Sequence, residues 1–272
     1  MTTLTTHPDV DETQRVLPRP KRIDGIPMGR IVGVELRKMF DTRSGFWLMA
    51  SIAIAATLAT GAVILFASDS SITYDSFGAA IGVPMTVLLP VVAILSVTSE
   101  WSQRSGLTTF TLVPHRGRIV TAKLAATLVV GVTSMLVALG IGAVGNVLGS
   151  TIKGVDTVWD ISLNQVLSII LANVLGMLVG FMLGVLIRNS AGAVVGYFVF
   201  AFVLPTLSAL LAGSQAWFRD LQPWVDFNFA TRALLEGPLS SQQWVHLAAT
   251  GLVWLIVPLA VGLRLVVRAE VK

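Results

Sequence analysis

Few side chains in this sequence are suited to covalent or metal-based chemistry. The 272 residues include no cysteine, which excludes thiol nucleophiles and cysteine-ligated metals. The three histidines, His7, His115 and His246, lie far apart and lack the close spacing of metal-binding pairs. We therefore expect no catalytic residue and no metal site in this chain.

One segment has part of the composition of a phosphate-binding loop. Residues 145–154, GNVLGSTIKG, combine glycines with Ser and Thr. They lack the GK[ST] ending that would place a lysine and a hydroxyl beside bound phosphates. We expect the chain to have no nucleotide-binding domain and to bind no cofactor itself.

The composition points to lipid as the main solvent of this protein. Hydrophobic residues make up 54% of the chain and charged residues 12%, with a mean hydropathy of +0.79. About 20 apolar residues are needed for a helix to cross the hydrocarbon core, and lipid-exposed backbone must be helical or closed into a barrel. The uniformly apolar runs predict an all-α integral membrane protein with six spans, at about 46–67, 78–98, 124–148, 164–187, 191–212 and 247–267.

The interior of these predicted spans contains no Asp, Glu, Lys, Arg or His. Ion-coupled carriers and intramembrane proteases usually place ionisable groups there, where they are costly and functional. The notable polar side chains are Asn146 and Asn173. Such amides are more often interhelical hydrogen-bonding groups than ligands, but they are the residues we consider for a transport pathway.

The segments outside the spans predict the orientation. Six spans place both termini on one side, and that side carries 16 of the 19 lysines and arginines. The excess of positive charge predicts that both termini are cytoplasmic. Residues 1–27 contain four prolines and mixed charges, and we expect a flexible cytoplasmic tail.

Residues 28–43, MGRIVGVELRKMFDTR, have the period of an amphipathic helix. Met28, Val32, Leu36 and Phe40 recur at intervals of four, and basic residues lie mostly on the other side. We expect a helix in the inner membrane interface. It either anchors the first span or also supports a cytoplasmic partner, and the residues of interest are Glu35, Arg37, Lys38 and Phe40.

Two predicted spans carry glycines at intervals of four. Gly176, Gly180 and Gly184 lie in the fourth span, and Gly192 and Gly196 lie in the fifth. Small residues at this spacing let helix backbones approach closely. Packing within one chain is the more common use of such a stripe, and a contact between chains is the alternative.

The polar segment between the second and third spans, residues 99–123, is too long to be a simple connector. It contains a glutamate, a tryptophan, several threonines, a proline and four basic residues. One interpretation is a solvated loop that anionic lipid holds through its basic residues, which would mark the membrane surface up to Lys123. The other is a docking surface for a soluble protein.

This combination of features resembles the permease subunit of ABC-2 type ATP-binding-cassette exporters. The resemblance covers about residues 28–272 and rests on the ELRK helix at 35–38, the six spans and the loop pattern E…T…L…P…R…K. The matching loop residues are Glu100, Thr108, Leu112, Pro114, Arg116 or Arg118, and Lys123.

The resemblance implies that the loop couples to a separate ATPase. Its coupling residues would be Glu100, Trp101, Arg104, Thr108, Leu112, Pro114, Arg116 and Arg118. The implied complex has two ATPase subunits that hold ATP and Mg, and a second permease chain, in a bacterial cell membrane. Residues 213–246 would form short helices outside the membrane. The expected partners are these proteins and lipid, with no nucleic acid.

The expected function is therefore that of a non-catalytic permease subunit in an ATP-driven exporter. Its cargo would be hydrophobic or amphipathic, such as a drug, a lipid or a peptide, because the predicted pathway walls lack fixed charge. Two other classes remain open. One is a secondary carrier or channel, and the other is a membrane assembly or sensory partner that does not transport.

Overall fold

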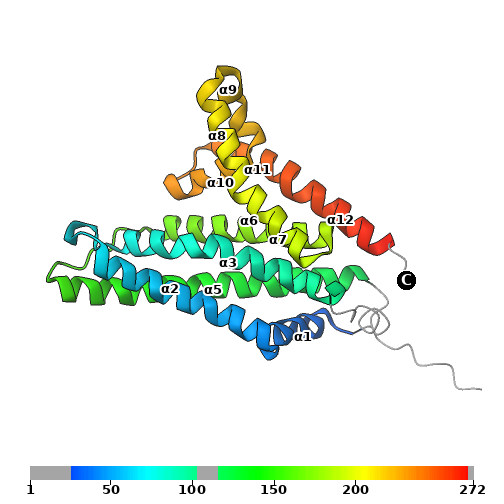
Figure 1. Cartoon of the computed structure of the whole chain (residues 1–272), viewed down its shortest axis with the longest axis horizontal. Coiled ribbons are helices and arrows are strands. Elements are labelled where there is room, and N and C mark those ends of the chain that lie inside the picture. The colour runs from blue at the N-terminus through cyan, green and yellow to red at the C-terminus, as the bar shows by residue number, and fades with distance from the viewer. Residues whose placement is uncertain (1–25, 103–115, 269–272) are drawn as a thin grey trace, which may run out of the picture.

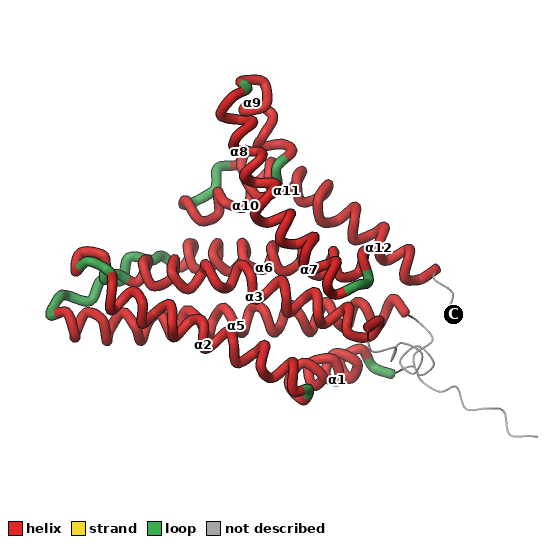
Figure 2. The backbone as a smooth tube through the Cα atoms, viewed as in Figure 1, coloured by secondary structure: helices red, strands yellow, loops and turns green. Residues whose placement is uncertain are grey.

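The computed structural model describes residues 26–102 and 116–268, and this part of the chain is helical with short connections (Figure 2). Its α-helices are α1 (Met28–Asp41), α2 (Arg43–Phe66), α3 (Tyr74–Ser102), α5 (Arg116–Lys153), α6 (Leu163–Ile187), α7 (Ser190–Phe198), α8 (Leu204–Ser214), α9 (Ala216–Val225), α10 (Phe227–Glu236), α11 (Ser241–Gly251) and α12 (Val257–Arg268). A 3₁₀ turn, η1 (Asp69–Ser71), and two π-helical turns, η2 (Val199–Val203) and η3 (Leu252–Ile256), complete the order.

Within the described residues, six helices are long and apolar enough to cross a membrane, which confirms the predicted multi-pass membrane protein. They run over Gly45–Phe66, Tyr74–Ser99, Gly117–Lys153, Leu163–Ile187, Ser190–Ser214 and Ser241–Val266. The fifth is built from α7, η2 and α8, and the sixth from α11, η3 and most of α12.

Several helices begin at residues whose short polar side chains accept a backbone N–H of the first turn, as the sequence favours. These N-caps are Thr42 before α2, Ser162 before α6, Asn189 before α7, Asp226 before α10 and Ser240 before α11. The turn between α6 and α7 is tight because Arg188 adopts a left-handed conformation with φ of 56°. The fifth span therefore starts directly against the fourth.

The first four spans run alongside one another as a bundle, with α3 in contact with the other three (Figure 1). α3 packs against α2, α5 and α6, and the core between them contains Ile81, Met85, Leu89 and Phe181, all at most 1% exposed. A second core forms where α6 meets α7, α10, α11 and η3. Because α6 contributes to both cores, it is the most buried span: 56% of the residues in its apolar stretch are buried inside the structure.

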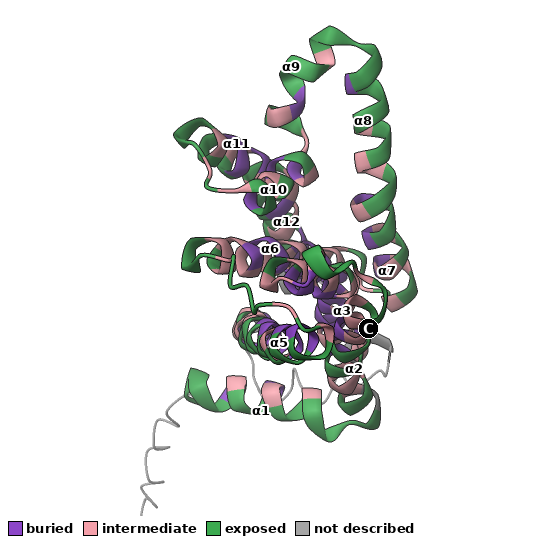
Figure 3. Cartoon of the chain, turned by 90° about the vertical axis from the view of Figure 1, so that its left-hand side faces the viewer, coloured by how far each residue is buried: buried purple, intermediate pink, exposed green. Residues whose placement is uncertain are grey.

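The fifth span has the opposite character. Only 11% of the residues in its apolar stretch are buried. Its second half, α8, stands apart from α10 and α11, and α9 crosses between them (Figure 3). Residues 213–246, predicted as the outer loop, contain the end of α8, all of α9 and α10, and the start of α11.

α1 lies at the end of the molecule where α12 also ends (Figure 1). The end of α3 and the start of α5 are at this same end. The candidate site lies at this end of the molecule, because α1 and the helices that flank the predicted coupling loop are found here.

Candidate functional site

α1 lies against the start of α5 and the start of α2. Its inner face places Ile31 and Glu35 at 8% and 5% exposure, and Leu36 and Met39 pack against the first core. Its outer face leaves Phe40 half exposed. The side of α1 that is buried against its own chain therefore carries Ile31 and Glu35, whereas Met28 and Phe40, the ends of the predicted apolar stripe, are exposed on a side with mixed basic and apolar character.

The contact between α1 and the spans is centred on a buried ion pair. The Nζ atom of Lys123, in α5, lies 2.6 Å from Oε2 of Glu35, and both side chains are at most 7% exposed. Lys38 donates to the other carboxylate oxygen of Glu35 at 2.8 Å. Lys123 also donates to the Ser96 carbonyl at 3.2 Å. One ammonium group therefore joins α1, α3 and α5.

The electrostatics of Glu35 favour the ionised carboxylate. Burial by itself would raise the pKa of Glu35 above its ordinary value of 4.5. The attraction and hydrogen bond of Lys123, helped by Lys38, outweigh that cost, so the pKa of Glu35 lies below 4.5. The carboxylate is thus charged at neutral pH and holds α1 in place.

This pair changes the interpretation of residues 99–123. The sequence indicated a loop that reaches the membrane surface at Lys123, but α3 continues to Ser102 and α5 already begins at Arg116. Lys123 is a buried helical residue because Glu35, 88 positions earlier, neutralises it inside the protein. The mixture of polar and basic residues concealed the early start of this helix.

The structure brings several of the predicted coupling residues to one place. Glu100 and Trp101 lie in the last turn of α3, and Arg116 is the first residue of α5. Arg118 donates to the Ile26 carbonyl at 2.6 Å, which ties the chain before α1 to the start of α5. The remaining predicted coupling residues, Arg104, Thr108, Leu112 and Pro114, lie outside the described residues.

The exposed side of α1 carries charges that its own fold uses little. The Arg37 side chain is 80% exposed and lies 4.0 Å from Asp41, at the limit of an ion pair. Such exposed pairs contribute little to stability. Arg37 and Phe40 are therefore available to lipid or to a partner, whereas Glu35 and Lys38 are engaged with each other and, through Glu35, with Lys123.

The two amides considered for a pathway are both buried. Asn146 is fully buried and donates through Nδ2 to the Val158 carbonyl at 2.9 Å, which holds the connection between α5 and α6. Asn173 is 7% exposed and donates to the Ile169 carbonyl one turn earlier in α6. The contacts of Asn146 are structural, and the pathway role of either amide stays a prediction.

The glycine stripe of the fourth span faces another helix of the same chain. A methyl group added at Gly180 would lie 2.6 Å from the Pro90 carbonyl oxygen, and one at Gly184 would lie 3.3 Å from the Ile94 carbonyl oxygen. α6 and α3 are therefore in near-backbone contact. Gly176 has more space, with Tyr197 3.8 Å away, and Gly192 and Gly196 pack against Ile187.

A tie between α3 and α7 was not foreseen from the sequence. Pro90 has no N–H, so the Thr86 carbonyl one turn earlier loses its helical donor. The Tyr197 hydroxyl donates to this carbonyl at 2.5 Å. The proline was a visible signal that a carbonyl in the second span needs a donor, but nothing in the sequence indicates that the donor is Tyr197.

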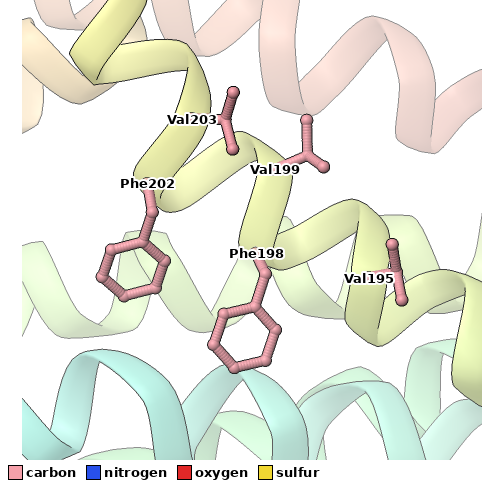
Figure 4. Close-up of a pocket in the computed structure, with 5 residues that line it drawn as sticks. All are labelled: Val195, Phe198, Val199, Phe202 and Val203. Atoms are coloured by element: carbon pink, nitrogen blue, oxygen red, sulfur yellow. The ribbon is translucent and has the colours of Figure 1, made fainter.

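An apolar pocket opens on the fifth span. It has a volume of about 500 Å³ and is lined by Val195, Phe198, Val199, Phe202 and Val203 from α7 and η2. Figure 4 shows the two phenylalanines on one side of the helix and the three valines on another. The phenyl rings stack with centroids 5.7 Å apart. These walls carry no charge.

Comparison with known proteins adds no assignment to these geometric observations. No model of a known protein family matches this chain, and no curated protein matches it significantly.

Proposed function

We propose that this protein is the membrane-spanning subunit of an ATP-driven ABC-2 type exporter and that a separate ATPase binds the end of the molecule where α1 lies. The observation that carries the proposal is the Glu35–Lys123 pair, which joins α1 to α5, with the Lys123–Ser96 hydrogen bond extending the contact to α3. These three helices include both flanks of the predicted coupling loop.

Two features make this arrangement suitable for coupling. A partner that moves the loop would also move α1, because a buried ion pair is not easily broken. The exposed Arg37 and Phe40 give that surface a basic and apolar character for contact with the partner. A movement of the partner would therefore reach the spans through several helices at once.

The proposed cargo is hydrophobic or amphipathic. The open apolar pocket on the surface of the fifth span is compatible with this choice, because its five lining side chains are aliphatic or aromatic and 40–62% exposed. Among the described span residues, two ionisable side chains are buried in contacts within the chain. Lys123, in the third span, is paired with Glu35. His246, near the start of the sixth span, is in edge-to-face contact with Trp224. A second permease chain would complete the pathway, and the cell membrane of a bacterium is the proposed location.

The secondary carrier and the assembly partner differ from this proposal in a measurable way. A carrier would move its substrate without an ATPase, and an assembly partner would bind a protein without moving a substrate. The buried partner of Lys123 disfavours the carrier, because this charged group is occupied by the contact with Glu35 within the fold.

The experiment is affinity purification of the tagged full chain from its native membrane in mild detergent, followed by identification of the copurifying subunits and an ATPase assay. We expect a nucleotide-binding subunit in stoichiometric amount. The variant Arg37→Glu should reduce its recovery, because the substitution reverses a charge on the proposed contact surface.

The matched control is Arg232→Glu, which reverses an exposed arginine on α10, in the predicted outer segment. It should leave recovery of the ATPase unchanged. Recovery of the chain without an ATPase, or equal loss in both variants, would refute the proposed docking surface. Movement of amphiphiles in vesicles reconstituted with both subunits would then separate an exporter from an assembly complex.

A further inference from the structure

The fifth and sixth spans contain the same irregularity at the same distance from a proline. The turn η2 ends two residues before Pro205, and η3 ends two residues before Pro258. In each case the residue after the turn donates to the carbonyl five positions back: Leu204 to Val199, and Val257 to Leu252. Such π-helical turns are rare in regular helices and often lie at functional positions.

The proline and the π-helical turn together free a backbone carbonyl. The N–H of Leu204, the usual helical donor to Phe200, goes to Val199, and Pro205 has no N–H to offer. The Asn228 side chain, from α10, donates to the Phe200 carbonyl at 3.1 Å. A residue of another helix therefore replaces the missing helical hydrogen bond at the point where the fifth span is weakest.

The two turns also contact each other. The rings of Phe200 and Trp254 lie 5.7 Å apart, so an aromatic pair joins η2 to η3. Trp254 also donates from its indole nitrogen to the Val225 carbonyl at 2.7 Å, at the end of α9. The end of α9 and the start of α10 thus hold both turns, because Trp254 donates to the last residue of α9 and Asn228 of α10 donates to η2.

α8 and α9 form a hairpin with its own polar ties. Gln222 donates to the Ser208 hydroxyl at 3.0 Å, and Arg219 donates to the Ala212 carbonyl at 3.0 Å. α8 packs mainly against α9 and η2, and it stands apart from α10 and α11 in Figure 3. The hairpin is therefore internally connected. One end of it is the irregular η2 turn, and at the other end α9 packs against α11 and α10, with the rings of Trp224 and His246 4.4 Å apart.

We propose that η2 is a hinge about which the α8–α9 hairpin swings. The latch that holds the hairpin in the observed position is formed by the hydrogen bond from Trp254 to Val225, by that from Asn228 to Phe200 in η2 itself, and by the packing of α9 on α10 and α11. The hinge is a property of this chain alone. It does not require that the chain be part of an ATP-driven exporter.

The test measures the distance between two spin labels in the full chain reconstituted in lipid nanodiscs. The absence of native cysteine means that Ser214→Cys, at the end of α8, and Ser70→Cys, in the connection between α2 and α3, are labelled without removing other thiols. The reference pair is Ser70→Cys with Thr151→Cys. Both positions are exposed, and both belong to the bundle of the first four spans, in η1 and α5.

Removing the latch should release the hairpin. We expect Trp254→Phe, which keeps an aromatic ring but removes the indole donor, to add a second distance population for the 70–214 pair. Asn228→Leu should do the same. Pro205→Ala restores an N–H in the fifth span and should suppress this second population when combined with Trp254→Phe. The 70–151 distance should stay constant throughout.

The matched control is Trp244→Phe. Trp244 is an exposed tryptophan of α11, which belongs to the same sixth span as Trp254. It should leave the 70–214 distances as in the unsubstituted chain. The proposal is overturned if Trp254→Phe and Asn228→Leu both leave the distribution unchanged. It is also overturned if Trp244→Phe broadens the distribution equally, or if Pro205→Ala does not suppress the second population.

Discussion

Glu35→Gln should release α1 from the spans while the rest of the fold persists. The substitution removes the charge of Glu35 from beside the buried Lys123 ammonium group, and breaking one side of a buried ion pair costs about 3–5 kcal/mol. The loss falls on the docking of α1, because the first core is formed mainly by residues of α2, α3, α5 and α6. Local opening, rather than global unfolding, is therefore the quantity to measure.

Amide hydrogen exchange over residues 28–41, in nanodiscs, reports this opening. Each 1.4 kcal/mol corresponds to about a tenfold change in an equilibrium constant, so protection should fall by roughly 10²- to 4 × 10³-fold, up to the protection that α1 has initially. Lys123→Met should have a smaller effect, because Lys38 still neutralises Glu35 at 2.8 Å. The order of the two effects follows directly from the geometry.

The control is the exposed pair on the same helix. Arg37→Met removes a contact of 4.0 Å between side chains that are 80% and 67% exposed, and protection of α1 should be unchanged. Equal protection in Glu35→Gln and Arg37→Met would refute the reasoning, because it would mean that the buried pair does not hold α1.

Three further outcomes follow from the structure. The pKa of Glu35 is lowered, so its ion pair stabilises α1 fully above the ordinary value of 4.5, and the protection of the α1 amides, corrected for their intrinsic exchange rate at each pH, should fall as the pH drops below 4.5 through the lowered pKa. Gly180→Ala should destabilise the protein by about 1–3 kcal/mol in reversible unfolding in mixed micelles, because of the clash with the α3 backbone, whereas Gly140→Ala has free space and should not. Tyr197→Phe should cost about 1–3 kcal/mol by leaving a carbonyl unpaired, and Pro90→Ala should rescue most of this loss by restoring the helical donor; additive losses in the double variant would contradict this account.

The spans were predictable because they depend on the sum of many apolar residues. The described helix Leu163–Ile187 differs from the predicted 164–187 by one residue at its start, since a polar N-cap and a tight turn mark its ends. The amphipathic period of residues 28–43 likewise predicted α1. Its position in the membrane interface and the side on which it lies stay predictions.

The contacts of the candidate site were not predictable in the same way. Sequence indicates that Glu35 and Lys123 are charged and near membrane edges, but not that they meet across 88 positions. Their pairing depends on how α1 crosses α5, which is set by packing. Without knowledge of that contact, a lysine at position 123 is expected at the surface. The loop was therefore predicted to extend as far as Lys123.

Pro90 and Pro205 both lack a backbone N–H, but the effect on the bending of their helices differs. Pro90 frees a carbonyl in α3 that Tyr197 satisfies, and Tyr197 is 3% exposed within the second core. Pro205 has an equivalent effect on the Phe200 carbonyl, which Asn228 satisfies. The surroundings differ: α3 is packed on several sides, whereas the fifth span is only 11% buried. Bending at Pro90 would have to disrupt a close-packed core, but bending at η2 needs only the loss of the latch, that is, of its two hydrogen bonds and of the contacts of α9 with α10 and α11. The same missing N–H therefore fixes the shape of α3 and leaves the α8–α9 hairpin able to move.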